Sequence, residues 1–444
     1  MSDNLDPNSR AYQEILESFN EVHNTLYESE AQFSDFGLAE DVLTAVRDDF
    51  GFTKPSLVQS NVIPKALQDP PKNLMIQSQS GTGKTLAFLL SSIARVDRSI
   101  QAPQVLILSP TREIARQVYS VLFRLVTHTN PPVLISCLIK DTSTAVLPKS
   151  THTPKEAKES HIIVGTIGSV YNHINILNFQ NFKMIVFDEA DQITSVLTAS
   201  MQGQTEKRKL TQILSKLPPS CQRLFVSATY SKEALTIVLP LVKENCESPF
   251  VLDVANDQLP LNCIVQTALY CPNEEERLFL LVEVLNELSV GQAIVFMNRK
   301  DVARQLKTTL EGQGYGVELL TGELSPEVRD AVFDKFNKNE IRFIVTTDVL
   351  QRGIDVRHVM FVINYDLPQH FDGNINMEGY LHRIGRTGRF GKRGIAINFT
   401  YDDDTVNRVK MISQTFNKPI PFIVLDNLAE LVAKIEKEHQ ESQK

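Results

Sequence analysis

The feature that most constrains this chain is a repeated alternation of short apolar runs with helix-compatible segments. The first series of runs is "NLMIQS", "QVLILSP", "HIIVGT", "KMIVFD" and "RLFVSAT", and a second series after about residue 290 is "QAIVFMN", "GVELLTG", "RFIVTTD", "VMFVINY" and "GIAINFT". Short runs without polar alternation are typical of strands that are buried on both faces. The pattern therefore predicts an α/β fold whose parallel sheets are covered by helices on both sides.

The chain has 444 residues, more than one hydrophobic core usually fills. Each series of runs is long enough for one domain, so we predict two tandem domains, 31–245 and 265–430. Residues 246–264 carry Pro, Asn and Asp with little periodicity and are predicted to be the linker. Residues 1–30 form an N-terminal extension, either a solvated arm or an inhibitory helix, and residues 431–444 form a polar tail.

Composition narrows the functional classes. A hydrophobic content of 42% with 22% charged residues is ordinary for a soluble protein. Five cysteines without metal-type spacing indicate reduced thiols in an intracellular compartment. Neither a membrane-length apolar run nor a signal peptide is present, so we expect no membrane insertion. The net charge of -8 argues mildly against nucleic-acid binding, which must therefore come from a local basic patch.

The sharpest local motif is "SQSGTGKT", which lies between a predicted strand and a predicted helix. In a P-loop, backbone N–H groups and a helix N-terminus surround phosphates. Gly81 and Gly83 let the backbone approach, Lys84 reaches the β- and γ-phosphates, and Thr85 offers a hydroxyl to Mg²⁺. A glycine-rich turn that caps a helix is the alternative. The motif predicts these nucleotide-binding residues: Ser78, Gln79, Ser80, Gly81, Thr82, Gly83, Lys84 and Thr85.

The run "KMIVFD" ends in Asp188-Glu189-Ala190-Asp191. Carboxylates packed this closely repel one another and are costly to desolvate, so either they cap a helix or a cation lies beside them. Because the run ends at the same predicted sheet edge as the P-loop, we expect a magnesium–nucleotide there. Asp188 would hold Mg²⁺ through ATP and water, and Glu189 would polarise an attacking water. Asp191 could cap the helix or link to the segment around Ser227.

These four residues spell the DEAD box, and the chain resembles the DEAD-box ATP-dependent RNA helicases from about Phe33 to beyond Arg393. The resemblance implies two tandem RecA-like domains. The segment "GFTKPSLVQ" is similar to the Q motif, in which Gln59 would read the adenine edge and Phe52 would offer an apolar surface. "SPTREIA" is similar to motif Ia, where Arg112 would meet an RNA phosphate.

Further motifs follow in the family's order. "SAT" resembles motif III, and "AIVFMNRK", "TTDVLQRGIDV" and "HRIGRTGR" resemble motifs IV, V and VI. By resemblance, Arg386 and Arg389 are arginine fingers supplied in cis, and Asp355 lies near the ribose. The alternatives for the two arginines are a solvated basic loop and a patch that binds nucleic-acid phosphates. The implied coupling residues are Asp191, Ser227, Thr229 and His382. The implied RNA-binding residues are Arg112, Thr166, Gly168, Arg299, Thr321, Gly322, Arg329, Thr346 and Arg352.

The expected activity is RNA-stimulated ATP hydrolysis, with ATP and Mg²⁺ as cofactors. The expected catalytic residues are Lys84, Asp188, Glu189, Arg386 and Arg389. ATP and RNA would together favour domain closure, and hydrolysis would reopen the domains. RNA would be held through phosphates and 2′-OH groups with little sequence preference, so a short duplex is separated or a bound protein displaced. The alternatives are an ATP-gated RNA clamp with little turnover and a DNA-directed motor.

Longer stretches resemble a subfamily, the mRNA-export DEAD-box helicases of the nuclear pore's cytoplasmic face. They are "PPKNLMIQSQSGTGKT", "DLPQHFDGNINMEGYLHRIGRTGRFGKRG" and "FNKPI". The resemblance implies that the partners are a nucleoporin and an activator that works with an inositol polyphosphate. The chain itself is expected to be a monomer. The segment 369–379 is longer than usual in the family, and a tolerated surface loop is an equal alternative for it. Ser169 stands where the family has Arg in Thr-Pro-Gly-Arg, and Pro326 where it usually has Gln, so these changes fall on the expected RNA surface.

Overall fold

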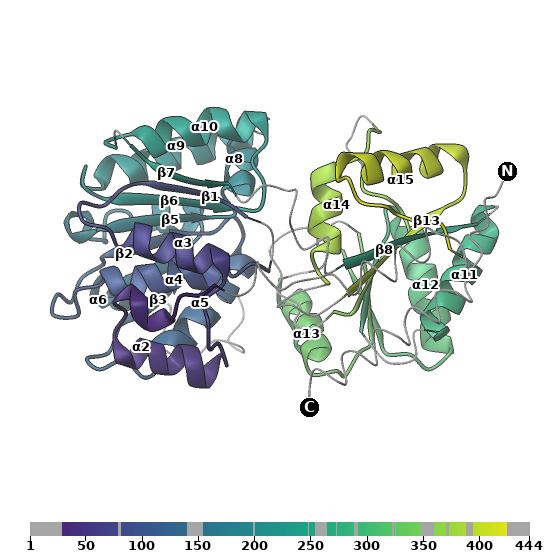
Figure 1. Cartoon of the computed structure of the whole chain (residues 1–444), viewed down its shortest axis with the longest axis horizontal. Helices are drawn as coiled ribbons and strands as arrows, with labels where there is room; N and C mark the ends of the chain where they lie inside the picture. Colours follow the sequence, from purple (N-terminus) through teal and green to yellow (C-terminus); the bar gives the residue numbers. More distant parts are fainter. Residues whose placement is uncertain are drawn as a thin grey trace. The chain divides into compact units, whose positions relative to one another are not determined.

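A computed structural model describes residues 29–78, 81–139, 154–198, 200–246, 248–253, 264–271, 273–287, 292–321, 324, 326–347, 359–369, 373–387 and 394–423. These residues divide into two compact units, one up to residue 253 and the other from residue 264 onward. Each unit is an α/β domain, as Figure 1 shows. In the described part of the chain, no helix has both the length and the apolar character needed to cross a membrane.

The first unit is built on a parallel sheet with the strand order β3-β4-β2-β5-β6-β1-β7. Its strands are β1 Leu74–Gln77, β2 Val105–Leu108, β3 Ile135–Leu138, β4 Ile162–Gly165, β5 Met184–Asp188, β6 Gln222–Ser227 and β7 Phe250–Asp253. Its helices are η1 Phe33–Phe36, α2 Glu40–Thr44, η2 Ala45–Asp49, α3 Leu57–Ala66, α4 Lys84–Arg95, α5 Arg112–Val126, α6 Pro154–Glu159, α7 Ile167–Asn172, η3 Phe179–Asn181, α8 Ala190–Thr198, α9 Ser200–Lys216 and α10 Lys232–Lys243.

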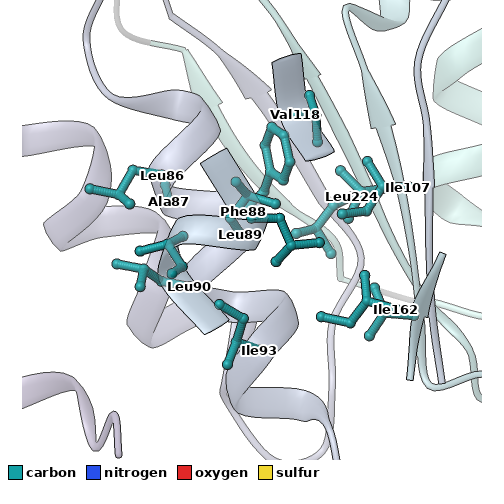
Figure 2. Close-up of a cluster of buried hydrophobic side chains, with 14 of the residues drawn as sticks. Leu86, Ala87, Phe88, Leu89, Leu90, Ile93, Ile107, Val118, Ile162 and Leu224 are labelled. Carbon is teal, nitrogen blue, oxygen red and sulfur yellow. The ribbon is translucent and has the colours of Figure 1, made fainter. Parts of the chain in front are cut away.

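Helices cover both faces of this sheet because successive strand residues point to opposite sides and both sides are apolar. Ile76 and Val186 pack with α3, α4 and α5, whereas their neighbours Met75 and Ile185 pack with α7 to α10. Figure 2 shows the first of these cores, where side chains of α4 such as Leu89 lie against the sheet. Burying one such side chain stabilises the fold by about 1.5–3 kcal/mol.

The second unit repeats the design with the strand order β10-β11-β9-β12-β13-β8, again all parallel. Its strands are β8 Ile264–Tyr270, β9 Ala293–Phe296, β10 Val317–Leu320, β11 Phe343–Thr346, β12 Phe361–Asn364 and β13 Gly394–Thr400. Its helices are α11 Glu274–Glu287, α12 Lys300–Gly312, α13 Pro326–Asn337, α14 Met377–Ile384 and α15 Asp403–Thr415. Proline is well tolerated at the first helical position, which explains how Pro326 can open α13.

The predicted α/β class and the strand at every quoted apolar run are confirmed. The linker range needs correction, because Phe250–Asp253 form β7, the edge strand that pairs with β1, and Ile264 already begins β8. An edge strand needs only one partner, so a short apolar run beside Pro249 suffices. Residues 1–28 of the predicted extension 1–30, the predicted tail 431–444 and most of the predicted linker lie outside the described residues. In the long connection, the described Gln369 and Ile375 form an antiparallel bridge.

Candidate nucleotide and RNA sites

The predicted P-loop connects the carboxyl end of β1 to the start of α4. Gly81 and Gly83 have φ values of 84° and 91°, a left-handed backbone that favours glycine. The Ser78 N–H donates to the Ser227 carbonyl at 3.1 Å, and the hydroxyls of Ser78 and Thr82 lie 2.8 Å apart. Lys84 Nζ donates to the Ser78 carbonyl. The loop is thus anchored to β6 while its lysine turns back over it. Thr85, half-buried, follows Lys84 in the first turn of α4.

Gln59 connects this loop to the start of α3. Its Oε1 accepts the Ser56 N–H at 2.9 Å, and its Nε2 donates to the Gly83 carbonyl at 3.3 Å. Ser56 Oγ donates to the Thr82 carbonyl at 2.7 Å, so the pair fixes the P-loop from the side. A primary amide has two N–H groups and a carbonyl with two lone pairs, and these two bonds use one of each. The remaining N–H and the remaining lone pair of Gln59 can therefore hydrogen-bond to an adenine edge. The ring of the half-buried Phe52 stacks on the ring of Phe50, with the ring centroids 6.2 Å apart.

The acidic cluster lies at the end of β5, two strands from β1. Asp188 is buried, and burial together with the charges of Glu189 and Asp191 raises its pKa well above the usual range, while Lys84 opposes the rise. Glu189 has φ of 48°, which is strained for a residue with a side chain. The ionised carboxylate at Asp188 therefore needs an additional positive charge.

The donor set suits a magnesium ion carried by a nucleotide. Among the described residues, no group of three or more His, Cys, Asp or Glu side chains could hold a metal by itself. Mg²⁺ commonly takes one or two protein oxygens and fills its other positions with phosphates and water. The buried carboxyl of Asp188 and the hydroxyl of Thr85 are oxygen donors of this kind, so the residues fit the ion.

Asp191 lies in the first turn of α8, and both of its carboxylate oxygens are engaged. Ser227 Oγ donates to Oδ1 at 2.7 Å, and Thr229 Oγ1 donates to Oδ2 at 3.2 Å. Of the two roles left open by the sequence, the contacts favour the link to the segment after β6. The same Ser227 accepts the P-loop N–H through its carbonyl, so this serine contacts both motifs.

The predicted RNA residues of the first unit follow the neighbouring strands β2 and β4. Arg112 begins α5, and Thr166 precedes α7, whose second residue is Gly168. The Ser109 N–H donates to the Gly165 carbonyl at 2.9 Å, which joins the two loops. The sheet order therefore separates the predicted functions, with the RNA residues at β4 and β2 and the nucleotide residues at β5, β6 and β1.

In the second unit the predicted RNA residues follow β9, β10 and β11, which are also adjacent. Arg299 is exposed and pairs with Asp301 at 2.6 Å, and Arg329 on α13 is half-buried. Thr321 and Thr346 are buried. Thr346 is the last residue of β11, and its side chain is fully buried in this conformation.

The motif with two predicted arginine fingers begins on α14, which Asn376 caps by accepting the Gly379 N–H at 2.7 Å. His382 and Arg386 are buried, and Arg386 Nε donates to the His382 carbonyl at 3.2 Å. The predicted residues Gln79, Ser80, Gly322, Arg352, Asp355 and Arg389 lie outside the described residues.

The sequence reasoning missed Arg383, the residue after His382. It is fully buried and donates to the Asp366 carbonyl at 2.6 Å and to Asn298 Oδ1 at 3.4 Å. Asn298 is the residue before Arg299, so Arg383 joins the motif IV loop to the motif VI helix. Its place between two motif residues is the signal that could have identified it.

Comparisons with known proteins identify the family of this chain. Residues 56–237 match the family model described as DEAD/DEAH box helicase, and residues 276–391 match the helicase conserved C-terminal domain. The ATP-dependent RNA helicase dbp5 of Schizosaccharomyces pombe is 34% identical over 431 residues, which cover 96% of this chain and 81% of that protein. The chain belongs to the DEAD-box family of ATP-dependent RNA helicases.

Solved structures of this family share the fold. S. cerevisiae Dbp5 bound to RNA and ADP BeF3 has a TM-score of 0.78 at 31% identity, with 91% of this chain and 99% of that chain covered. A point variant of S. cerevisiae Dbp5, bound to Nup159, a Gle1 variant, IP6 and ADP, has a TM-score of 0.66 at 30% identity, with 90% and 100% covered. Both units of this DEAD-box helicase are RecA-like domains.

Proposed function

We propose that this DEAD-box helicase uses RNA-stimulated ATP hydrolysis to separate short RNA duplexes or to displace proteins from RNA during mRNA export. The observation that carries the proposal is the single sheet edge of the first unit, which holds both predicted sites. The P-loop follows β1, the acidic cluster begins at the last residue of β5, and Ser227 is the last residue of β6. The residues predicted to bind RNA follow the adjoining β2 and β4. The bonds of Asp191 to Ser227 and Thr229 provide a direct contact between the acidic cluster and the segment after β6.

We assign the hydrolytic roles within the first unit as follows. Lys84 releases the Ser78 carbonyl and binds the β- and γ-phosphates, while Gln59 keeps the P-loop in place and reads the adenine. Glu189 accepts a proton from the attacking water at its carboxylate. Asp188 and Thr85 would hold Mg²⁺ through ATP and water, and the ion would supply positive charge to the phosphates.

In the second unit we assign Arg386 and Arg389 to the transition state. Negative charge is spread over the transferred phosphoryl oxygens, and a guanidinium stabilises that charge. We assign Arg299 and Arg329, together with Arg112 of the first unit, to RNA phosphates. Such contacts fix the position of RNA without reading its sequence.

We further propose that this chain works at the cytoplasmic face of the nuclear pore and is present in both cytoplasm and nucleus. The Dbp5 structure with Nup159, Gle1 and IP6 supports a nucleoporin, an activator and an inositol polyphosphate as partners. The described part of this chain corresponds to that protein over both units. Binding of purified Gle1 and Nup159 homologues from the same source would test the assignment.

The test of the activity is ATP hydrolysis titrated with single-stranded RNA and with DNA of matched sequence, at several salt concentrations. We expect stimulation by RNA, little by DNA, and loss of turnover in Glu189→Gln with ATP and RNA binding retained. The Glu189→Gln variant keeps the side-chain size, so its defect reports the charge. Undiminished hydrolysis in that variant would remove Glu189 from its role, and RNA binding without stimulated turnover in the unsubstituted protein would favour the clamp.

A further inference from the structure

The RNA surface of the first unit contains a helix without positive charge. α7 reads Ile-Gly-Ser-Val-Tyr-Asn, and Ser169 offers only a hydroxyl, which accepts a hydrogen bond from Thr166 at 3.1 Å. Most contacts to a nucleic-acid backbone are made to phosphate oxygens, and Lys and Arg supply most of the binding free energy there. A cation from another element is therefore expected beside α7 if this surface binds RNA.

The neighbouring helix α9 supplies such a cation. A Cβ atom placed on Gly168 would lie 3.9 Å from Lys209 Nζ and 4.0 Å from Glu206 Oε1. The lysine ammonium therefore lies beside the α7 backbone at Gly168, at ordinary van der Waals distance from where a side chain would begin. The exposed Lys207 and Arg208 precede it, so three consecutive cations occupy this turn of α9.

Lys209 is held in place by its own helix. Its Nζ lies 2.7 Å from Glu206 Oε1, one turn earlier, and the two side chains are 26% and 21% exposed. An ion pair that still contacts solvent contributes at most about 1 kcal/mol, so a phosphate can replace the carboxylate. A hydrogen bond from the same ammonium to an RNA phosphate oxygen is also charge-assisted, like the bond to the carboxylate that it would replace.

We propose that Lys209 is an RNA-phosphate ligand of this helicase, supplied by α9 to the uncharged α7, and that Glu206 positions it and competes with RNA for it. The inference rests on the proposed RNA-binding function of this surface. It assigns to α9 a contact that none of the predicted RNA residues makes, because all of them follow strands β2 and β4 in the first unit. Glu206 then lowers the affinity for RNA while keeping the lysine ordered.

The test is the affinity for a fluorescein-labelled poly(U) oligonucleotide in the presence of a non-hydrolysable ATP analogue. We expect Lys209→Gln to weaken binding about three- to tenfold and to reduce the salt slope by about 0.7, the value for one phosphate contact to a single strand. Lys209→Arg should restore most of the affinity. Lys216→Gln is the matched control, because this exposed lysine is about two turns further along α9 and near the opposite sheet edge.

Glu206→Gln separates the proposed competition from a general charge effect. Alone, it should tighten RNA binding. In the double variant with Lys209→Gln it should have no effect, since the two residues act through one contact. Equal tightening in both backgrounds would refute the competition, and equal binding by the Lys209→Gln and Lys216→Gln variants would refute the phosphate contact. Thermal midpoints of all variants establish folding. Absence of RNA binding by the unsubstituted protein would instead refute the proposed function.

Discussion

The hydroxyl of Ser227 provides a quantitative test of the contact between motifs. The side chain is fully buried, and its Oγ donates to the Asp191 carboxylate at 2.7 Å. Ser227→Ala removes that donor but keeps the longer hydrogen bond from Thr229 Oγ1 to Asp191 Oδ2, at 3.2 Å. A hydrogen bond to a charged group contributes about 1.5–3 kcal/mol, so the free energy of unfolding of the first unit should fall by about 2 kcal/mol.

Hydrogen exchange can measure this loss within the intact chain. A change of about 2 kcal/mol corresponds to roughly 30-fold faster exchange of the β6 and α8 amides. The β9 and β12 amides of the second unit should be unaffected and serve as the internal reference. In a domain of this size, the same loss would lower its thermal midpoint by roughly 4–8 °C.

Two further variants identify the cause of the loss. Ser91→Ala is the matched control, because this buried hydroxyl donates only to the Ala87 carbonyl within α4. Asp191→Asn makes the acceptor neutral, so Ser227→Ala should cost roughly half as much in that background. Unchanged exchange in Ser227→Ala, or the same loss in both backgrounds, would show that the bond to the carboxylate contributes little.

Two other predictions concern the same unit. Gly83→Ala would place a Cβ 2.3 Å from Gln59 Nε2 at a φ of 91°, so the affinity for ATP should fall more than about tenfold. Gly37→Ala is the control: its Cβ would have no atom within 4 Å, so this variant should change only the stability. Tight ATP binding by the Gly83→Ala variant would contradict the predicted clash with Gln59. Burial and Arg98 lower the pKa of His161 below 6.5, so its contribution to stability is present above that pH and is lost as the pH falls through the lower folded value. His161→Asn can still accept the Leu134 N–H and should flatten the decline of the thermal midpoint in acid, whereas an unchanged slope would assign the acid sensitivity to other groups.

Local sequence patterns predicted much of this fold. Every quoted apolar run became a strand because its burial on both faces depends only on local composition, and the P-loop followed from the strand, glycines and helix in sequence. β7 was missed because an edge strand makes one set of ladder bonds and needs little apolar sequence. Its assignment depends on pairing with β1, about 175 residues earlier in the chain.

Contacts between distant residues were the harder part. The sequence offered the link between Asp191 and Ser227 only as one of two roles, because the residues are 36 positions apart and no local pattern decides between the roles. Likewise, the motif letters gave Thr346 as an RNA residue, but its position at the end of β11 buries the side chain. Lys209 lies outside every quoted motif, and only the packing of α9 on α7 brings it to Gly168.

The left-handed backbone at Glu189 sets the stability of the fold against the catalytic role that we propose for this residue. Its φ of 48° costs a residue with a side chain about 1–3 kcal/mol relative to a relaxed conformation, and glycine largely avoids that cost. A library selected only for expression or heat resistance should therefore accumulate Gly at this position. A library selected for RNA-dependent turnover should retain Glu there, and comparison of the two would measure how strongly the active site opposes the optimum for folding.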